Sequence, residues 1–450
     1  MNADASPEPV LPTDLVVGTA TASWQVEGDV SRRGRCIWDD FAERPGAIVD
    51  GTTGEPACDH LRRFDDDLAM IEDLGFDAYR FSISWPRVQP GGRGDVSAAG
   101  LDVYDRMVDR LLERGIDPIV TLYHWDLPSE LPGWTERETA ERFARYVGAV
   151  ADRLADRVSR WATLNEPWVS AYLGYASGIH APGVRDPQAA IASAYHLMLG
   201  HGLAMRELRR AHAREAGIVL NLIPVIPDSA ATHAAARHID GLHNRFFLDL
   251  LSGRGIAPEV IASTNGVCDW SFLRDEDLAV MAEPIDWLGE NYYTVMRVAS
   301  ADHAGPDLDA YPGSPPARFA PREPVTDMGW EVYPEGLVDA LSMAAAALPG
   351  VPLWVTENGA AVIDDIDPAG VHDPDRVHYY REHVRAVLRA REAGIDVRGY
   401  LAWSLLDNIE WAEGFTKRFG IVRVEPETLQ RMPKDSARWW QARLAERVSP

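Results

Sequence analysis

Two glutamates of this 450-residue chain stand directly after apolar, strand-like runs, where their carboxyl groups could act as a pair. Glu166 follows the run RVSRWATLN, and Glu357 follows the run VPLWVT. Glycoside hydrolysis needs such a pair, because one carboxyl protonates the departing oxygen while the other attacks the anomeric carbon or activates a water molecule. The two glutamates are therefore the candidate catalytic residues.

The neighbours of the two carboxyls predict different protonation states. Glu166 is followed by Pro167 and Trp168, and a carboxyl in dry surroundings has a raised pKa, which favours the acid role. Arg80 lies in the run AYRFSISW, and its guanidinium near Glu357 would lower the pKa of that carboxyl. We therefore expect Glu357 to stay ionised.

Polar or aromatic residues end six of the eight strand-like runs. They are Arg80, His124, Trp125, Asp126, Asn165, Glu166, Asn291, Tyr292, Tyr293, Glu357, Asn358, Trp403, Glu410 and Trp411. One such residue would be an ordinary helix-capping or surface group, but the same feature on six strands predicts one shared site. The tryptophans that could stack on sugar rings there are Trp24, Trp125, Trp168, Trp330, Trp403 and Trp411.

A recurring pattern of helix, glycine and apolar run predicts the elements that position these residues. The glycines are Gly75, Gly115, Gly217 and Gly394, and each suits the left-handed conformation that ends a helix. The runs are too continuously apolar for half-exposed strands and are typical of buried parallel strands. Eight strands are predicted, at about 15–22, 78–85, 117–124, 159–165, 217–223, 285–293, 352–357 and 397–404.

Amphipathic helices between the strands, for example 101–114 and 376–393, complete an α/β pattern. We therefore predict a closed (β/α)8 barrel (TIM barrel) as a single domain over 14–450, after a flexible tail of residues 1–13. The segment 301–325 is rich in proline and has no periodicity, so a long loop is expected on the site face of the barrel.

Composition restricts the partners. Lys and Arg number 44 against 69 Asp and Glu, which gives a net charge of -25 and argues against nucleic acid and anionic membranes as partners. No apolar stretch is long enough to span a bilayer and no signal peptide is recognised, so a cytoplasmic protein is expected. Three cysteines without zinc spacing predict buried free thiols and no metal.

Other readings of the barrel are a metal-dependent hydrolase and a non-catalytic sugar-binding protein. The first would need an H-x-H strand or an H-E-x-x-H helix, and the 13 histidines form neither. The second should have lost one of the two carboxyls, and both are present. Transglycosylation shares the covalent intermediate of hydrolysis, so the sequence does not separate these two reactions.

Two motifs carry a strong resemblance to glycoside hydrolase family 1. The chain has T-L-N-E-P at 163–167 and T-E-N-G at 356–359, and the resemblance runs from about residue 14 to 442. The family implies that Glu166 is the acid/base and Glu357 the nucleophile, with Arg80 and Tyr293 supporting the nucleophile. The sugar-binding positions implied by the resemblance are Gln25, His124, Trp125, Asn165, Asn291, Tyr293, Trp403, Glu410, Trp411 and Phe419.

The same resemblance implies finer roles. Asn165 would hold the sugar 2-hydroxyl, and Gln25 and Glu410 would bind the region of the 4-hydroxyl from two sides. Trp168 and Trp330 resemble tryptophans of the aglycone side. Phospho-β-glycosidases replace the Glu-Trp pair at 410–411, and myrosinase-like members carry Gln at the acid/base position. This chain therefore resembles the ordinary O-glycosidases, which act on unphosphorylated sugars.

Five positions depart from the family pattern: Leu15, Val17, Trp24, Leu61 and Glu290. None removes a catalytic group, but the first three could alter the packing beneath the sugar, so the substrate preference stays open.

The sequence predicts a retaining exo-β-glucosidase without a cofactor. It would release terminal non-reducing β-D-glucosyl residues from cellobiose, short oligosaccharides and aryl or alkyl glucosides, with β-galactosidase and β-fucosidase side activity. A retaining mechanism requires the two carboxyl groups to lie about 5–5.5 Å apart. Such an enzyme would serve cellulose degradation. The natural aglycone, the oligomeric state and the pH optimum are not predicted.

Overall fold

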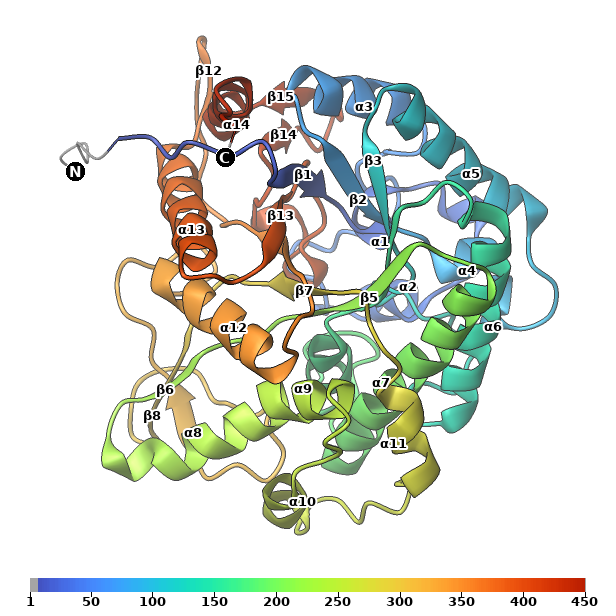
Figure 1. Cartoon of the computed structure of the whole chain (residues 1–450), viewed down its shortest axis with the longest axis vertical. Coiled ribbons are helices and arrows are strands. Elements are labelled where there is room, and N and C mark those ends of the chain that lie inside the picture. The colour runs from blue at the N-terminus through green and yellow to red at the C-terminus, as the bar shows by residue number, and fades with distance from the viewer. Residues whose placement is uncertain (1–6, 450) are drawn as a thin grey trace.

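A closed barrel of eight parallel strands forms the centre of the computed structural model, which describes residues 7–449 (Figure 1). The order around the barrel is β1-β13-β10-β7-β5-β4-β3-β2. The strands are β1 Val16–Ala20, β2 Ala78–Ser82, β3 Asp117–Thr121, β4 Arg160–Asn165, β5 Glu215–Leu220, β7 Trp287–Asn291, β10 Leu353–Asn358 and β13 Val397–Trp403. Each overlaps one predicted strand, so the predicted (β/α)8 barrel is confirmed.

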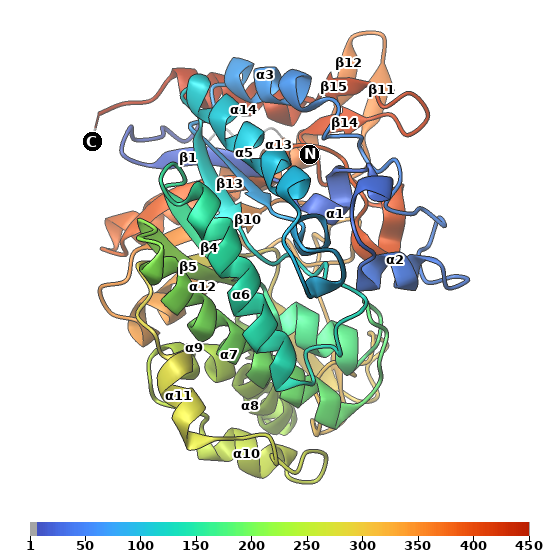
Figure 2. The same ribbon diagram turned by 90° about the vertical axis from the view of Figure 1, so that its right-hand side faces the viewer.

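Helices form the outer layer, and Figure 2 shows α5, α6 and α7 side by side over one side of the barrel. The longer helices are α3 Phe64–Asp73, α5 Ala98–Glu113, α6 Arg137–Leu154, α7 Pro187–Arg210, α12 Pro334–Ala347, α13 Pro374–Glu392 and α14 Asp435–Ala445. The shorter ones are α1 Ser23–Val26, α2 Ile37–Ala42, α4 Trp85–Val88, α8 His233–Asp240, α9 Phe246–Leu251, α10 Pro258–Thr264 and α11 Asp275–Met281. The helices predicted at 101–114 and 376–393 correspond to α5 and α13.

One apolar residue from each barrel strand contributes to a separate buried cluster. Seven are buried, and Val16 of β1 packs against them; the buried ones are Ala78, Ile119, Ala162, Val219, Trp287, Trp354 and Leu401. Two glycines are required by close packing between strands. A Cβ on Gly399 would lie 2.0 Å from the Trp354 ring, and one on Gly217 would lie 2.1 Å from the backbone carbonyl oxygen of Trp287.

Three of the four predicted helix-ending glycines have the expected left-handed backbone. The φ angles are 80° at Gly75, 72° at Gly115 and 90° at Gly394. The prediction for Gly217 was wrong, because this residue lies inside β5 and is required by close strand packing. The left-handed residue after α7 is His212, with a φ of 57°.

Small sheets extend the loops around the barrel. The segment 301–325 was predicted to lack regular structure, but β9 Ala317–Phe319 within it pairs with β8 Met296–Ser300, which pairs with β6 Val225–Pro227. Two antiparallel hairpins follow later in the chain. They are β11 Asp365–Asp367 with β12 Gly370–His372, and β14 Val422–Val424 with β15 Arg431–Pro433.

The two ends of the described chain lie against each other and against the barrel. Pro12 forms a parallel β-bridge with Val448, and Leu11 is buried. Glu8 forms an ion pair with Arg381. Residues 7–13 of the segment predicted as a flexible tail thus make ordered contacts, and residues 1–6 lie outside the described residues.

The three cysteines, Cys36, Cys58 and Cys268, are free and buried, as predicted. Over residues 7–449, no helix has the length and apolar character needed to cross a membrane.

Candidate active site

The polar residues predicted at strand ends meet at the carboxyl-terminal end of the barrel. In a (β/α)8 barrel this end carries the catalytic groups, because the eight loops that follow the strands converge there. Residues from β2, β4, β7 and β10 form one hydrogen-bonded group, which contains Arg80, Asn165, Glu166, Asn291, Thr356 and Glu357. All six are buried.

Glu357 receives two short hydrogen bonds from opposite sides. Arg80 Nη1 donates to its Oε1 at 2.6 Å, and the Tyr293 hydroxyl donates to its Oε2 at 2.6 Å. Arg80 Nη2 also donates to Asn165 Oδ1 at 2.6 Å, which fixes the plane of the guanidinium. The carboxylate of Glu357 is therefore held in one orientation at the end of β10.

Glu166 is positioned through Asn291. The amide Nδ2 of Asn291 donates to Glu166 Oε1 at 2.5 Å and to Asn165 Oδ1 at 3.0 Å. The Thr356 hydroxyl donates to Asn291 Oδ1 at 2.8 Å, so the orientation of the amide is fixed. Thr356 belongs to the T-E-N-G motif and Asn291 was named as a strand-end residue, but their mutual contact could not be read from the sequence.

Burial raises the pKa of both carboxyls. For Glu166 burial and the charge of Glu357 raise the pKa to about 8. Burial also raises the pKa of Glu357, although Arg80 and Tyr293 act to lower it. The expectation that Arg80 would hold the pKa of Glu357 below its ordinary value is therefore wrong, because desolvation of the carboxylate exceeds the effect of the guanidinium.

The two carboxyls nevertheless differ in their partners. Glu357 touches a cation, whereas Glu166 receives its hydrogen bond from the neutral amide of Asn291. A proton held by the pair is therefore more stable on Glu166. The arrangement supplies an ionised carboxylate next to a carboxylic acid, which is what acid-assisted nucleophilic displacement requires.

The predicted sugar-binding side chains carry buried polar atoms that lack a hydrogen-bond partner within residues 7–449. These atoms are Gln25 Oε1, His124 Nδ1 and Glu410 Oε2. Buried polar atoms are nearly always hydrogen-bonded in folded proteins, so these three atoms would bond water or the hydroxyl groups of a ligand. Glu410 lies near Glu357, and burial together with that charge raises the pKa of Glu410 to about 8.

The tautomer of His124 follows from its neighbour. Asn165 Nδ2 donates to His124 Nε2 at 3.1 Å, so the ring proton lies on Nδ1, which can donate to a ligand hydroxyl. Burial lowers the pKa of His124, and the ring stays neutral. Gln25 is held by bonds from its Nε2 to Asn408 Oδ1 at 3.0 Å and to the Ile409 carbonyl at 2.8 Å.

Aromatic rings form one wall around these polar groups. The Trp411 ring lies 4.3 Å from Trp125 and stacks on Trp24 at 5.9 Å, while Trp403 stacks on His124 at 6.0 Å. Trp125, Glu166 and Trp411 have φ angles of 72°, 45° and 47°. Non-glycine residues in this left-handed region cost on the order of 1–3 kcal/mol each and are typical of functional sites.

On the other side, Trp168 and Trp330 lie in separate aromatic groups. The Trp168 ring stacks on His243 at 4.1 Å and lies 5.4 Å from Tyr311. Tyr311 belongs to the segment 301–325, which therefore packs against a tryptophan two residues after Glu166. His243 was missed, because nothing in the sequence around it distinguishes it from a core histidine.

Trp330 and Phe419 close the site beside Glu357. Both rings pack against Tyr293, at 5.6 Å and 5.8 Å between centroids. Within residues 7–449 no group of three or more His, Cys, Asp or Glu side chains is arranged to hold a metal ion.

The comparisons with known proteins cover nearly the whole chain. The family model described as glycosyl hydrolase family 1 matches residues 8–447. A bifunctional beta-D-glucosidase/beta-D-fucosidase of Bifidobacterium breve is 44% identical over 459 residues, with 97% of this chain and 98% of the relative covered. Beta-glucosidase A of Thermotoga maritima is 40% identical, with 96% of each chain covered.

Solved structures agree with the fold. The psychrophilic beta-glucosidase BglU from Micrococcus antarcticus has a TM-score of 0.93 and 41% identity, with 98% of each chain covered. A beta-glucosidase from Thermotoga maritima in complex with deoxynojirimycin has a TM-score of 0.90 and 38% identity, with 98% of this chain and 100% of that chain covered.

Proposed function

Because this chain belongs to glycosyl hydrolase family 1, we propose that it is a retaining exo-β-glucosidase. Its substrates are β-glucosides with a free non-reducing end, such as cellobiose, short oligosaccharides and aryl or alkyl glucosides. The relatives named as β-glucosidases support this activity, and the Bifidobacterium breve relative supports a side activity on β-fucosides. A side activity on β-galactosides is a further part of the proposal.

The observation that carries the proposal is the buried pair of carboxyls with different partners. In the first step, a carboxylate oxygen of Glu357 attacks the anomeric carbon, while Glu166 gives its proton to the departing oxygen. The bond to the aglycone breaks and a glucosyl ester on Glu357 forms. In the second step, Glu166 takes a proton from water, the water oxygen displaces Glu357, and glucose leaves with its configuration retained.

The charge coupling between the two carboxyls supports the change of role. The negative charge of Glu357 is one cause of the raised pKa of Glu166. Formation of the ester removes this charge, so the pKa of Glu166 falls and the residue becomes a better base. The acid of the first step is thereby converted into the base of the second.

The side chains around the pair suit a neutral sugar. Gln25, His124 and Glu410 present buried polar atoms to hydroxyl groups, and none of the three carries the positive charge that would bind a 6-phosphate. Asn165, Trp125, Trp403, Trp411 and Phe419 complete this proposed glycone set. Trp168 and Trp330 are proposed for the aglycone side. The carboxyl separation of about 5–5.5 Å expected for retention stays a prediction.

Release of p-nitrophenol from its β-D-glucoside tests the proposal. The wild type should be active, and Glu357→Ala should be inactive until azide is added, when α-glucosyl azide should form. Glu113→Ala, which removes an exposed carboxylate far from the site in sequence, is the matched control and should keep full activity. An active Glu357→Ala without azide would contradict the assignment of the nucleophile.

An inactive wild type on glucoside, galactoside and fucoside would contradict the substrate but not the fold, and bulkier or phosphorylated glycosides should follow. The cytoplasmic location, the exclusion of nucleic-acid and membrane partners and the expectation of a single domain stay predictions from composition and pattern.

A further inference from the structure

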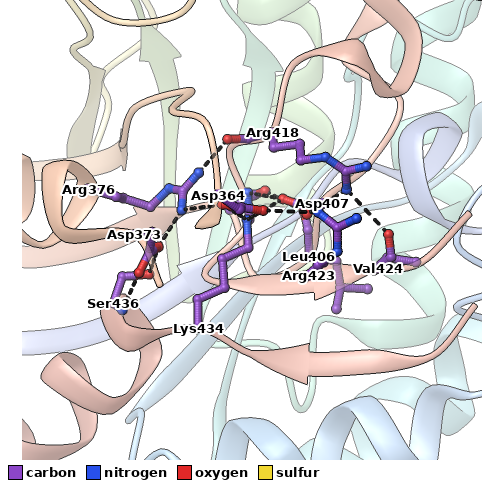
Figure 3. A network of polar contacts seen from close by, with 12 residues as sticks. Asp364, Asp373, Arg376, Leu406, Asp407, Arg418, Arg423, Val424, Lys434 and Ser436 are labelled. Carbon is purple, nitrogen blue, oxygen red and sulfur yellow. Dashed lines mark hydrogen bonds and ion pairs between the residues drawn. The ribbon is translucent and has the colours of Figure 1, made fainter. Parts of the chain in front are cut away.

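A buried cluster of seven charged residues lies behind the site and has no part in the chemistry described above (Figure 3). Its members come from the loop after β10, the start of α13, the loop after β13 and the β14–β15 region. They are Asp364, Asp373, Arg376, Asp407, Arg418, Arg423 and Lys434. We refer to these residues as the rear ion cluster.

Lys434, like Arg376, is a wholly buried cation that joins two carboxylates of the cluster. Its Nζ donates to Asp407 Oδ1 at 2.9 Å and to Asp364 at 3.0 Å. Figure 3 shows the side chain rising from the chain after β15 to meet both groups. Only two of the 44 basic residues are lysines, Lys417 and Lys434, so a compact ammonium is an exception in this chain.

One chain of contacts leads from Lys434 to the carboxylate of Glu357. Asp407 Oδ1, which accepts from Lys434, also accepts from the backbone N–H of Gly420 at 3.0 Å. Arg376 Nη2 donates to the carbonyl of Arg418 at 2.5 Å. The backbone on both sides of Phe419 is therefore anchored in the rear ion cluster.

Phe419 connects this anchored backbone to the carboxylate of Glu357 through Tyr293. Its ring meets Tyr293 edge to face, with centroids 5.8 Å apart and planes at 82°. The hydroxyl of Tyr293 donates to Glu357 Oε2. A displacement of Phe419 would therefore free Tyr293 to turn away from the carboxylate.

A second chain of contacts leads to the sugar side. Asn408 follows Asp407 directly, and its Oδ1 accepts from Gln25 Nε2 at 3.0 Å. Asn408 Nδ2 donates to Ser404 Oγ and to the Leu406 carbonyl, both at 3.1 Å. The position of the backbone at Asp407 thus sets the position of the Gln25 amide.

We infer that Lys434 is a positioning residue for both halves of the site, acting through Asp407 on the Phe419–Tyr293 contact and on the Asn408–Gln25 contact. This inference rests on the proposed function. Without the ammonium, Asp364 keeps Arg376 and Arg423 as cationic partners and Asp407 keeps Arg418. Both carboxylates are then expected to shift toward these arginines and away from each other. The site is disturbed although no residue that touches the substrate has changed.

Kinetics of Lys434→Met test the inference, with rates expressed per active site after titration with a slow 2-deoxy-2-fluoroglucoside. A misplacement of reacting groups by about 1 Å costs about 10²-fold in rate, so kcat/KM on p-nitrophenyl β-glucoside should fall by about that factor. Because Gln25 is proposed to face the 4-hydroxyl, KM should rise for the glucoside and change less for the 4-deoxyglucoside.

The pH profile supplies a readout that loss of folded protein would not move. Glu357 faces Arg80, Tyr293 and Asn291 as well as the carboxyls of Glu166 and Glu410. Since the Tyr293 hydroxyl lowers the pKa of Glu357, the acid limb of kcat/KM should move to higher pH in Lys434→Met. An unchanged profile with unchanged KM would overturn the inference.

Lys417→Met is the matched control, because Lys417 is the other lysine, precedes Phe419 by two residues and bonds the Asp327 carbonyl from a partly exposed position. Its kcat/KM should stay within about threefold of the wild type. If Lys434→Met does not fold, Lys434→Met/Asp364→Asn removes the buried pair together and should fold while keeping the kinetic defect. Wild-type kinetics in the double variant would also overturn the inference, whereas an inactive wild type would contradict the proposed function instead.

Discussion

Replacement of Tyr293 by phenylalanine isolates one hydrogen bond to the proposed nucleophile. The substitution keeps the ring that packs between Trp330 and Phe419 and removes only the hydroxyl that lies 2.6 Å from Glu357 Oε2. A hydrogen bond to a charged group contributes about 1.5–3 kcal/mol. If this contribution is realised in the transition state, kcat/KM on p-nitrophenyl β-glucoside falls about 10- to 150-fold.

The same substitution has a signed effect on the pH dependence. The Tyr293 hydroxyl is one of the groups that lower the pKa of Glu357 against burial, which raises it. Loss of the hydroxyl therefore raises this pKa, and a nucleophile that must be ionised becomes inactive at a higher pH. The acid limb of kcat/KM in Tyr293→Phe is expected to lie above that of the wild type.

The adjacent tyrosine offers a close control. Tyr292 is buried as well, but its hydroxyl donates to the Tyr333 carbonyl at 2.6 Å and faces away from the carboxyl pair. Tyr292→Phe should lose stability and keep the pH profile and kcat/KM of the wild type. The reasoning is refuted if Tyr293→Phe and Tyr292→Phe give the same kinetics, or if the acid limb of Tyr293→Phe moves to lower pH.

Three further predictions concern stability and the aglycone side. The pKa of Glu166 is about 8 in the folded protein, against an ordinary value of 4.5. The folded state therefore holds this proton more tightly than the unfolded state, which stabilises the fold at low pH, and this contribution to stability is lost as the pH rises through about 8. Glu166→Gln should therefore gain in Tm over the wild type at pH 8 but not at pH 4.5, as scanning calorimetry at both values can measure. Gly399→Ala places a methyl group 2.0 Å from the Trp354 ring and should destabilise the fold by about 1–3 kcal/mol, and an unchanged denaturation midpoint would show that the ring moves freely. Trp168→Ala should raise KM for cello-oligosaccharides more than for methyl β-glucoside, whereas equal effects would place Trp168 outside the aglycone side.

The barrel could be predicted because its strands are buried on both faces and are therefore continuously apolar. The apolar pattern does not show why a small residue is present at a given position. Gly217 looks like a helix end in the sequence, but the Trp287 carbonyl of the next strand excludes a side chain there. The short strand β9 was missed as well, because three residues carry no periodicity and its partner β8 was not predicted.

The residues of the site could be predicted from the sequence, but the pKa values of its carboxyl groups could not. Motif positions identified Glu166 and Glu357, and their contacts with Asn291 and Arg80 follow from the barrel. The net pKa of Glu357 could not be predicted, because it depends on how completely the barrel excludes water from the carboxylate. His243 could not be found either, because its contact with Trp168 joins segments that only the folded chain brings together.

The pairing of β1 with β13 affects how the chain is made. Val16 of β1 pairs with Gly399 of β13. The first strand therefore cannot form this pairing until the ribosome has added 383 further residues. At roughly 5–20 residues per second, a ribosome needs about 20–80 s to synthesise that interval. One edge of the first strand therefore stays open during most of translation, and an unpaired edge is a site for aggregation. We therefore expect slower translation to lower the yield of folded protein without changing the activity of the folded molecules.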